Sequence, residues 1–352
     1  MSTDPSLGVA ADQSFSVQLV VNATLASTVM GGAGDDVLWG GTAGSTMFGR
    51  GGDDILRDQG AATTMFGGTG NDQFVIYNLD SVIVEYTGEG TDTAWVAING
   101  YMVGDNVEIT RLAVTATLVY GANTNDQVVA NPLFGSTLFG RGGDDVLWGS
   151  SFADYLDGGD GDDIIRGQGG ADTMVGGAGN DQYVVLDPNV VIIEKPGEGY
   201  DTVWIGLAAN VPYTLPDNVE RGNLSGVANR LTGNAGDNVL VGDAVASLLD
   251  GGAGDDLIFG SPFADTITGG AGNDTLYLGG GADRVLYHGG GWGVDQIAGF
   301  SQADGAKLDF RGSGLTFADL NLNVANGNTQ VNHGADVILV FGAVLTAGDF
   351  LF

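Results

Sequence analysis

Apolar residues recur every nine positions over much of this chain. Between Gly140 and Val184 the sequence divides into GRGGDDVLW, GSSFADYLD, GGDGDDIIR, GQGGADTMV and GGAGNDQYV, each with an aspartate sixth and an apolar residue eighth. An α-helix cannot keep one face on a period of nine with this much glycine, whereas a strand of about three residues joined to a tight turn can. The pattern therefore predicts an all-β fold, a parallel β-roll or β-solenoid with the eighth residues in its core.

The nine-residue pattern fills three blocks of the chain. All 18 regular nines in these blocks have an apolar eighth residue, and 12 have aspartate at the sixth. A constant offset of 109 residues relates Asp36 to Asp145 and Trp95 to Trp204, which indicates an internal duplication. The blocks cover residues 22–75, 131–184 and 233–295.

The stretches between the blocks lose the nines but keep strand-like runs, such as Val82 to Tyr86 and Thr93 to Ile98. Segments of the form Gly-Glu-Gly-x-Asp, which end at Asp92 and Asp201, are degenerate versions of the same turn. We therefore expect longer coils of the same solenoid in these stretches and a β cap at each end, since an uncovered end exposes strand edges and core. The expected coils cover residues 76–130 and 185–232, and the expected caps cover residues 1–21 and 296–352.

The composition points to cations as partners. The chain has 352 residues, 44 of them acidic and 11 basic, with a formal charge of −33, so it is too acidic to attract nucleic acid or an anionic membrane. Although 63 residues are glycine, 43% are hydrophobic and fall at fixed places, which favours a folded repeat over disorder. The absence of cysteine excludes disulfides and thiolate metal sites.

The turn that carries the aspartates is suited to calcium. This ion takes six to eight hard oxygen ligands and accepts backbone carbonyls beside carboxylates, and glycine allows the backbone to aim its carbonyls inward. Zinc or copper would call for His or Cys, and magnesium for a stiffer octahedron. Aspartates stacked about 4.8 Å apart also repel one another by about 3 to 4 kcal/mol at an effective dielectric of about 20. We therefore predict a chain that is largely unfolded without calcium and folds cooperatively with it.

The motif G-G-x-G-x-D-x-U-x, repeated in phase, and the GEGxDT segments make the chain resemble secreted RTX (repeats-in-toxin) proteins with hemolysin-type calcium-binding repeats. In that family each calcium ion lies between two turns on one edge. It takes the carbonyls of places two and four with the aspartate of one turn, and those of places one and three with the aspartate of the next. The resemblance implies carboxylate ligands from Asp36, Asp54, Asp72, Asp145, Asp154, Asp163, Asp172, Asp181, Asp256, Asp265, Asp274, Asp283 and Asp295. It implies carbonyl ligands from Gly32, Gly34, Gly49, Gly51, Gly52, Gly67, Gly143, Gly158, Gly159, Gly161, Gly167, Gly169, Gly176, Gly252, Gly254, Gly269, Gly270, Gly272 and Gly290.

Counting same-edge pairs gives about eight calcium sites and three weaker candidates, eleven at most. The weaker pairs are Asp72 with Asp92, Asp181 with Asp201, and Asn238 with Asp256. If each nine is half a coil, alternate nines lie on opposite edges, and Asp154, Asp172, Asp265 and Asp283 lie on the second edge. Departures from the motif at Phe152, Phe263 and Leu278 affect sites on this second edge. The complete pairs are Asp36 with Asp54, Asp54 with Asp72, Asp145 with Asp163, Asp163 with Asp181, Asp154 with Asp172, Asp256 with Asp274, Asp265 with Asp283, and Asp274 with Asp295.

The resemblance also implies secretion from a bacterium by a type I apparatus that reads an uncleaved C-terminal signal. The start of the chain lacks a charged and apolar signal peptide, and the chain ends in Asp349-Phe350-Leu351-Phe352, as this route would require. Calcium outside the cell would then fold the chain.

Other motifs have both plain and functional interpretations. His288 and His333 could be a catalytic or zinc pair, although surface positions are the default. Glu85 and Glu194 could act on glycosidic bonds, but each belongs to its own copy of the duplication, so capping a coil or helping to hold an ion is favoured. The tryptophans could bind sugars, or simply pack at the rim of the roll. Ser27, Ser45 and Thr63 could form a surface-binding array, but hydroxyls closing turns without an ion are the simpler account. Of the five tryptophans of the chain, these are Trp39, Trp95, Trp148 and Trp204.

Almost every residue belongs to the repeat, which favours a non-enzymatic structural or adhesive role in a matrix or surface layer. Such a protein would bind cell-surface or matrix polysaccharide or assemble with itself. An extracellular lyase or epimerase on the solenoid is the main alternative, although no segment offers an acid, a base and an electrophile together. A small membrane-active protein is a third possibility, which the lack of an amphipathic or apolar helix disfavours.

Overall fold

The computed structural model describes residues 9–10, 18–20, 26–113 and 115–352. These residues form strands joined by turns, with two short 3-10 helices, so the all-β prediction is confirmed. The expected N-terminal cap strand, with Phe15, Val17 and Val21, lies largely outside the described residues. Within the described part no helix has the length and apolar character needed to cross a membrane.

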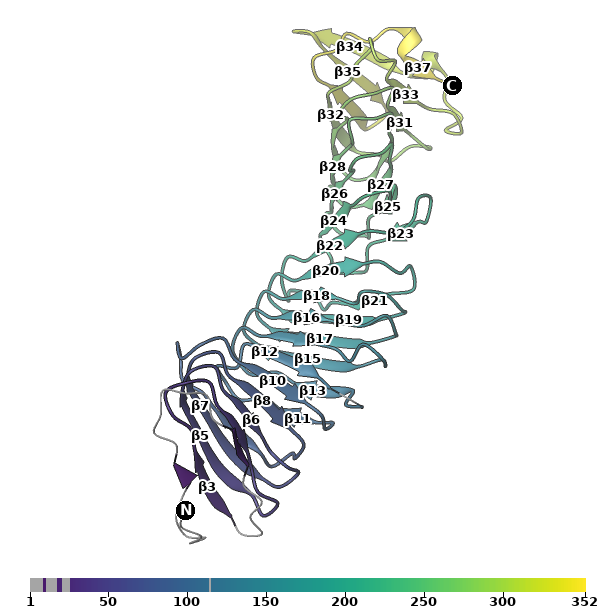
Figure 1. The fold of residues 1–352 in the computed structure, drawn as a ribbon. Helices are drawn as coiled ribbons and strands as arrows, with labels where there is room; N and C mark the ends of the chain where they lie inside the picture. Colours follow the sequence, from purple (N-terminus) through teal and green to yellow (C-terminus); the bar gives the residue numbers. More distant parts are fainter. Residues whose placement is uncertain (1–8, 11–17, 21–25, 114) are drawn as a thin grey trace. The chain divides into compact units, whose positions relative to one another are not determined.

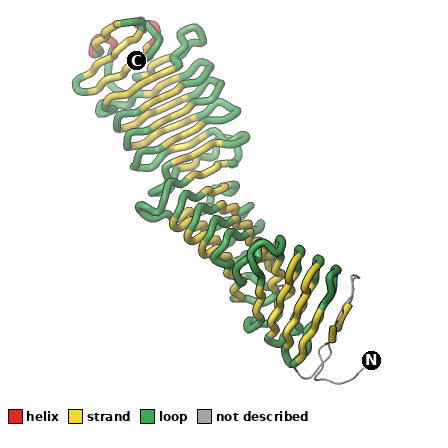
Figure 2. The backbone as a smooth tube through the Cα atoms, turned by 90° about the vertical axis from the view of Figure 1, so that its left-hand side faces the viewer, coloured by secondary structure: helices red, strands yellow, loops and turns green. Residues whose placement is uncertain are grey.

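The chain forms two compact units. The first comprises residues 1–179 with 189–191, and the second comprises residues 180–188 with 192–352. In each unit the chain winds in flattened coils, and strands of successive coils stack in parallel on two facing sheets, which appear as repeated yellow rungs in Figure 2. Each unit is therefore a β-solenoid.

In the first unit one face is a single sheet and the opposite face is built from two shorter sheets (Figure 1). The single sheet contains β2 (Gln18–Val20), β4 (Val37–Trp39), β6 (Ile55–Arg57), β8 (Gln73–Ile76), β10 (Thr93–Val96), β12 (Ile109–Leu112), β14 (Gln127–Val129), β16 (Val146–Trp148) and β18 (Ile164–Arg166). The opposite face contains β1 (Val9–Ala10), β3 (Ser27–Met30), β5 (Ser45–Gly51), β7 (Thr63–Thr69) and β9 (Val82–Val84), followed by β11 (Tyr101–Met102), β13 (Leu118–Tyr120), β15 (Thr137–Gly142), β17 (Tyr155–Asp160) and β19 (Thr173–Ala178). Strand β21 (Val191–Ile193) lies where the two units divide.

The core of each coil is built from the eighth residues of the nines. Leu38, Leu56 and Phe74 stand opposite one another on β4, β6 and β8, and Met47 stands opposite Met65 on β5 and β7. All 18 eighth-place side chains are fully buried. Burial of each of these side chains stabilises the fold by about 1.5 to 3 kcal/mol. A shift of one residue in a strand would turn its eighth residue out of the core, so this burial fixes the register.

The stretches without nines continue the solenoid, as predicted. Strand β10 pairs in parallel with both β8 and β12, and β14 pairs with both β12 and β16. The coils here differ in length: the step from Asp72 to Asp92 is 20 residues, and the step from Asp92 to Glu108 is 16. Insertions and deletions are absorbed in the turns while the strands keep their stacking.

The second unit has the same construction and a different end. One sheet contains β20 (Gln182–Val185), β22 (Thr202–Ile205), β24 (Arg221–Leu224), β26 (Val239–Val241), β28 (Leu257–Phe259), β30 (Thr275–Tyr277), β32 (Val294–Ala298) and β36 (Asp336–Val340). The other contains β23 (Tyr213–Thr214), β25 (Arg230–Thr232), β27 (Leu248–Ala253), β29 (Thr266–Ala271), β31 (Arg284–Leu286), β33 (Lys307–Asp309) and β37 (Phe350–Leu351).

The C-terminal segment closes the second unit with a different kind of pairing. Strand β36 pairs in parallel with β32, while β34 (Asn321–Ala325) and β35 (Asn328–His333) add to it as antiparallel strands. Strand β37 pairs with β33, and Phe350 and Phe352 pack against the ring of Phe310. The 3-10 helices Phe317–Asp319 and Ala347–Asp349 connect these strands. The apolar chain end is therefore part of the folded unit.

Several turns depend on left-handed backbone at the second and fourth places of the motif, as at Gly159 and Gly161. Gly161 has φ of +130°, and a Cβ atom at this position would collide with the carbonyl oxygen of Gly143 in the preceding coil. Gly169 lies in another turn of the same block, where a Cβ atom would have no neighbour within 4 Å.

We predict that Gly161→Ala lowers the free energy of unfolding by about 1 to 3 kcal/mol or more, because it adds backbone strain and a steric clash. Gly169→Ala should change stability by less than about 0.5 kcal/mol. Denaturant unfolding in saturating calcium measures both, and equal losses would contradict this account of the turn.

Candidate metal centres

The aspartates at the sixth place form ladders along the edges of the coils. In the first unit, the backbone N–H of Asp36 donates to Oδ1 of Asp54 and the N–H of Asp54 donates to Oδ1 of Asp72, each at 2.7 Å. The N–H of Asp72 donates in the same way to Asp92, 20 residues later. Asp54 and Asp72 thus each use Oδ1 to join two coils, while their Oδ2 atoms are buried without a hydrogen-bond partner.

The second carboxylate oxygen lies in a cradle formed by glycine backbone. A Cβ atom at Gly49 would collide with Oδ2 of Asp54 and would lie 2.5 Å from the carbonyl oxygen of Gly67. Glycine at the first place of the motif therefore keeps open a space where a carboxylate oxygen and a carbonyl oxygen converge. Buried Oδ2 atoms without a hydrogen-bond partner belong to Asp54, Asp72, Asp145, Asp256, Asp274 and Asp283.

The electrostatics of the ladder favour a cation. Burial raises the pKa of Asp54 from 3.8 to about 7, and the negative charges of Asp72 and Asp36 add to the shift. Burial and the charges of Asp126 and Asp163 raise the pKa of Asp145 to about 8. An ionised carboxylate in these places needs positive charge beside it.

The residues present fit calcium. All 13 aspartates predicted as ligands are buried, with at most 4% of the residue exposed, and hard oxygen atoms line the spaces that they enclose. Carboxylates beside carbonyl groups are the ligands that calcium accepts. When bound there, the ion would neutralise the ladder. Which aspartates and glycines share each ion stays a prediction, including the pairing of Asp163 with Asp181, which belong to different units.

The second edge differs between the blocks. In the first block it is closed by hydroxyl groups: Ser45 accepts from the N–H of Gly41 at 2.8 Å, and Ser81 accepts from the N–H of Thr63 at 3.2 Å. The hydroxyls thus take part in closing these turns, and the absence of an ion there stays a prediction.

Two aspartates on the second edge of the later blocks already accept a hydrogen bond from a serine hydroxyl of their own turn. The hydroxyl of Ser150 donates to Asp154, and that of Ser261 donates to Asp265 at 2.8 Å. Both serines occupy the second place of motifs in which Phe152 and Phe263 stand fourth. Asp154 and Asp265 therefore present less free carboxylate to an ion than the aspartates of the first edge.

Sequence reasoning missed several members of the ladders. Asp126 donates its N–H to Oδ1 of Asp145 at 2.7 Å, and its own Oδ2 accepts from the N–H of Ala122. The turn Gly121 to Asp126 has the right spacing between glycine and aspartate, which is the signal that could have found it. Asp336 of the C-terminal cap accepts from the N–H groups of Gly291 and Gly293. No sequence motif links these residues, which are more than 40 positions apart.

At the end of the first block a glutamate joins the ladder. Carboxylate oxygens of Asp72, Glu85 and Asp92 all lie within 4.8 Å of one another, and all three residues are buried. Oε1 of Glu85 accepts from the N–H of Gly67 at 2.7 Å, while its Oε2 has no partner. Burial and the charge of Asp92 raise the pKa of Glu85 to about 8. This cluster is a second kind of candidate metal centre, with three carboxylates.

The duplicated copy holds the equivalent cluster of Asp181, Glu194 and Asp201, again with oxygens within 4.8 Å of one another. Here the hydroxyl of Tyr183 donates to Glu194, whereas the equivalent residue in the first copy is phenylalanine. Among the described residues no other group of three His, Cys, Asp or Glu side chains is gathered as tightly. His288 and His333 are therefore not part of such a group.

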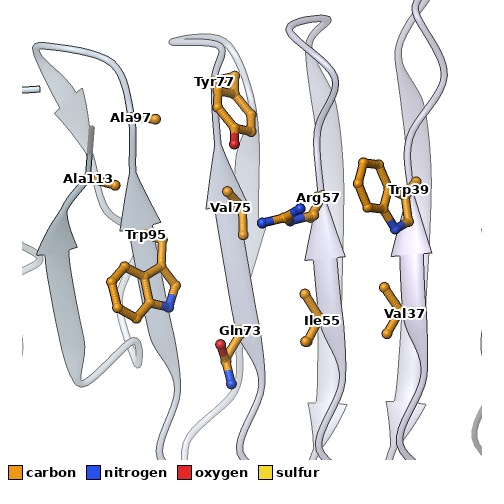
Figure 3. Close-up of a pocket in the computed structure, with 10 residues that line it drawn as sticks. All are labelled: Val37, Trp39, Ile55, Arg57, Gln73, Val75, Tyr77, Trp95, Ala97 and Ala113. Carbon is orange, nitrogen blue, oxygen red and sulfur yellow. The ribbon is translucent and has the colours of Figure 1, made fainter. Parts of the chain in front are cut away.

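Trp39, Trp95, Trp148 and Trp204 lie on the outward face of the strands, whereas Trp292 is buried against Tyr287 and Phe310. Figure 3 shows Trp39, Arg57, Val75 and Trp95 on four neighbouring strands, lining a shallow hollow of about 480 Å³. Trp95 is 37% exposed. This face carries no group of the metal centres and is a separate feature.

The comparison with protein families agrees with the repeat. The family model of the RTX calcium-binding nonapeptide repeat (four copies) matches residues 30–74, 136–156, 148–183, 226–244 and 250–285. Among solved structures, the chain is similar to the crystal structure of the extracellular lipase LipA from Serratia marcescens, with 18% identity and a TM-score of 0.28. The similarity covers 76% of this chain and 45% of that chain, so this chain spans less than half the length of the lipase. No curated protein sequence matches the chain.

We predict that Asp54→Asn lowers the calcium-dependent stability more than Asp36→Asn does, because Asp54 has a ladder neighbour on both sides and would serve two ions. The expected difference is about 1 to 3 kcal/mol. Thermal unfolding at a series of calcium concentrations measures it. Equal losses for the two variants would contradict the shared-ligand arrangement.

Proposed function

Because this chain is an RTX repeat protein, we propose that it is secreted, folds on calcium outside the cell and acts as a structural or adhesive element of a matrix or surface layer. The observation that supports this proposal is the ladder of buried carboxylates, whose second oxygens face glycine cradles between coils. Low calcium inside a cell would leave the negative charge of the carboxylate ladder uncompensated, and the chain would stay unfolded. Higher calcium outside the cell would neutralise that charge and allow the coils to form.

The role of the folded protein is inferred from where its residues are used. The aspartates and glycines of the turns build the coils, and the eighth residues build the core. What remains for a partner is the outward surface of the sheets. This distribution supports a static, surface-presenting role, and secretion by a type I apparatus belongs to the same proposal.

An enzymatic role on polysaccharide is the second candidate. The three-carboxylate cluster of Asp72, Glu85 and Asp92 favours it to the extent that grouped acids can serve proton transfer. All three residues are buried, however, so a polymer has no access to them in the folded chain.

Incubation of the calcium-loaded chain with a panel of acidic polysaccharides separates the two roles. We expect no new reducing or unsaturated chain ends, and we expect the protein to sediment with the polymer or as ordered assemblies. Release of shortened or unsaturated products would contradict the structural role. A protein that stays monomeric and binds no polymer would contradict the adhesive role as well.

A further inference from the structure

A regular row of side chains runs across the outward face of the first unit. The ninth residue of each coil stands directly opposite that of the next, because the strands pair in parallel without a shift in register. Tryptophan, arginine and valine alternate in this row with a period of three strands. From β4 to β18 the row reads Trp39, Arg57, Val75, Trp95, Arg111, Val129, Trp148 and Arg166.

Each arginine of the row lies over the ring of the preceding tryptophan. The guanidinium carbon of Arg57 is 5.0 Å from the ring centroid of Trp39, that of Arg111 is 5.7 Å from Trp95, and that of Arg166 is 4.6 Å from Trp148. Stacking on an aromatic ring holds each guanidinium in place on the sheet, and each arginine keeps part of its surface exposed. The face therefore presents three similar cation and aromatic pairs.

The charge of this face is opposite to that of the chain. None of the outward residues of the even-numbered strands β4 to β18, which form this sheet, is an aspartate or glutamate, although the chain has 44 acidic residues. The row contains three of the 11 basic residues of the whole chain. The companion row at the seventh places is neutral and reads Val37, Ile55, Gln73, Thr93, Ile109, Gln127, Val146 and Ile164.

The row also has hydrogen-bond donors that no protein group satisfies. The indole Nε1 atoms of Trp39 and Trp148 and the Nε atoms of Arg57 and Arg166 are buried without a partner. These four atoms have almost no accessible surface, so a ligand laid on this face would contact the accessible remainder of the half-buried tryptophans and arginines instead. Figure 3 shows the first of these pairs beside the side chains of Val75 and Trp95.

The wide spacing of the arginines favours a polymer whose negative charges are also widely spaced. Neighbouring arginines of the row are three strands apart, about 14 Å at a strand spacing of about 4.8 Å. Double-stranded DNA carries a negative charge about every 1.7 Å of its axis, so most of its charges would meet no cation here and would face a strongly acidic protein. A linear polymer with sparse charges and apolar sugar faces matches both the arginines and the rings.

We propose that this row is a binding site for a linear acidic polysaccharide that runs across the strands of the first unit. Its carboxylates pair with Arg57, Arg111 and Arg166, and its sugar rings stack on the exposed parts of the tryptophans. The proposal rests on the adhesive role described above and assigns it a class of partner.

The test compares two charge-matched variants of the full chain in calcium. The triple variant Arg57→Gln, Arg111→Gln and Arg166→Gln removes the cations of the row. The control variant Arg50→Gln with Arg141→Gln and Lys195→Gln removes the same number of cations outside the row, from β5, β15 and an exposed position after β21. Binding to immobilised hyaluronan, which has one carboxylate per disaccharide, is measured at increasing sodium chloride, with neutral dextran and single-stranded DNA as further ligands.

We expect the unsubstituted chain and the control variant to bind hyaluronan with similar affinity, and the triple variant to bind at least 10-fold more weakly with a smaller dependence on salt. Trp95→Ala should weaken binding to a similar degree. Circular dichroism in calcium checks that all variants fold.

Equal binding by the triple and control variants, or preference for DNA or dextran, would overturn the proposal. A chain that folds in calcium and assembles but binds no hyaluronan would also overturn it while leaving the structural role intact. A chain that calcium does not fold would instead overturn the proposed function itself.

Discussion

Repulsion between stacked carboxylates is the constraint on which this structure depends. Coils that repeat every 18 residues place Asp36, Asp54 and Asp72 above one another on one edge, and the hydrogen bonds between them fix their oxygens in buried positions. Burial and mutual repulsion both raise the pKa of Asp54, so the geometry opposes the charge that the residue carries in solution. A divalent cation between the coils turns this repulsion into attraction, which links the folded state to calcium.

The two edges of a coil differ in whether stacked carboxylates are present. Where hydroxyls take the sixth place, as at Ser45 and Thr63, hydrogen bonds close the turn, and the buried carboxylate of Asp58 beside Thr63 accepts from the hydroxyl of Ser81. Where Ser150 or Ser261 accompanies an aspartate, the carboxylate is partly satisfied by the protein itself. The duplicated clusters around Glu85 and Glu194 are the opposite case, because a third carboxylate is added where the regular nines end.

The sequence pattern predicted the fold well because every regular coil has the same requirement, to bury the eighth residue of each nine beside a tight turn. One apolar residue in nine had to be buried, and all 18 are. The longer coils near Asp92 were also predictable, since they keep a recognisable turn. The predicted aspartates lie on the edges as expected, although the sharing of ions among them remains a prediction.

Features that depend on neighbouring coils could not be read from the pattern. Asp336 reaches the turn at Gly291 across more than 40 residues, and only the folded cap brings them together. The alternation of Trp39, Arg57 and Val75 is invisible along the chain, because these residues are 18 apart and become a row only when the strands stack. The left-handed positions were predictable only in part, because Arg50, Arg141 and Gln168 take positive φ where the motif has glycine.

Far-ultraviolet circular dichroism of the whole chain, recorded in excess chelator and in millimolar calcium, tests the central claim most directly. The account predicts a largely unfolded spectrum in chelator and a cooperative gain of β signal as calcium is added. The same β spectrum under both conditions would contradict it.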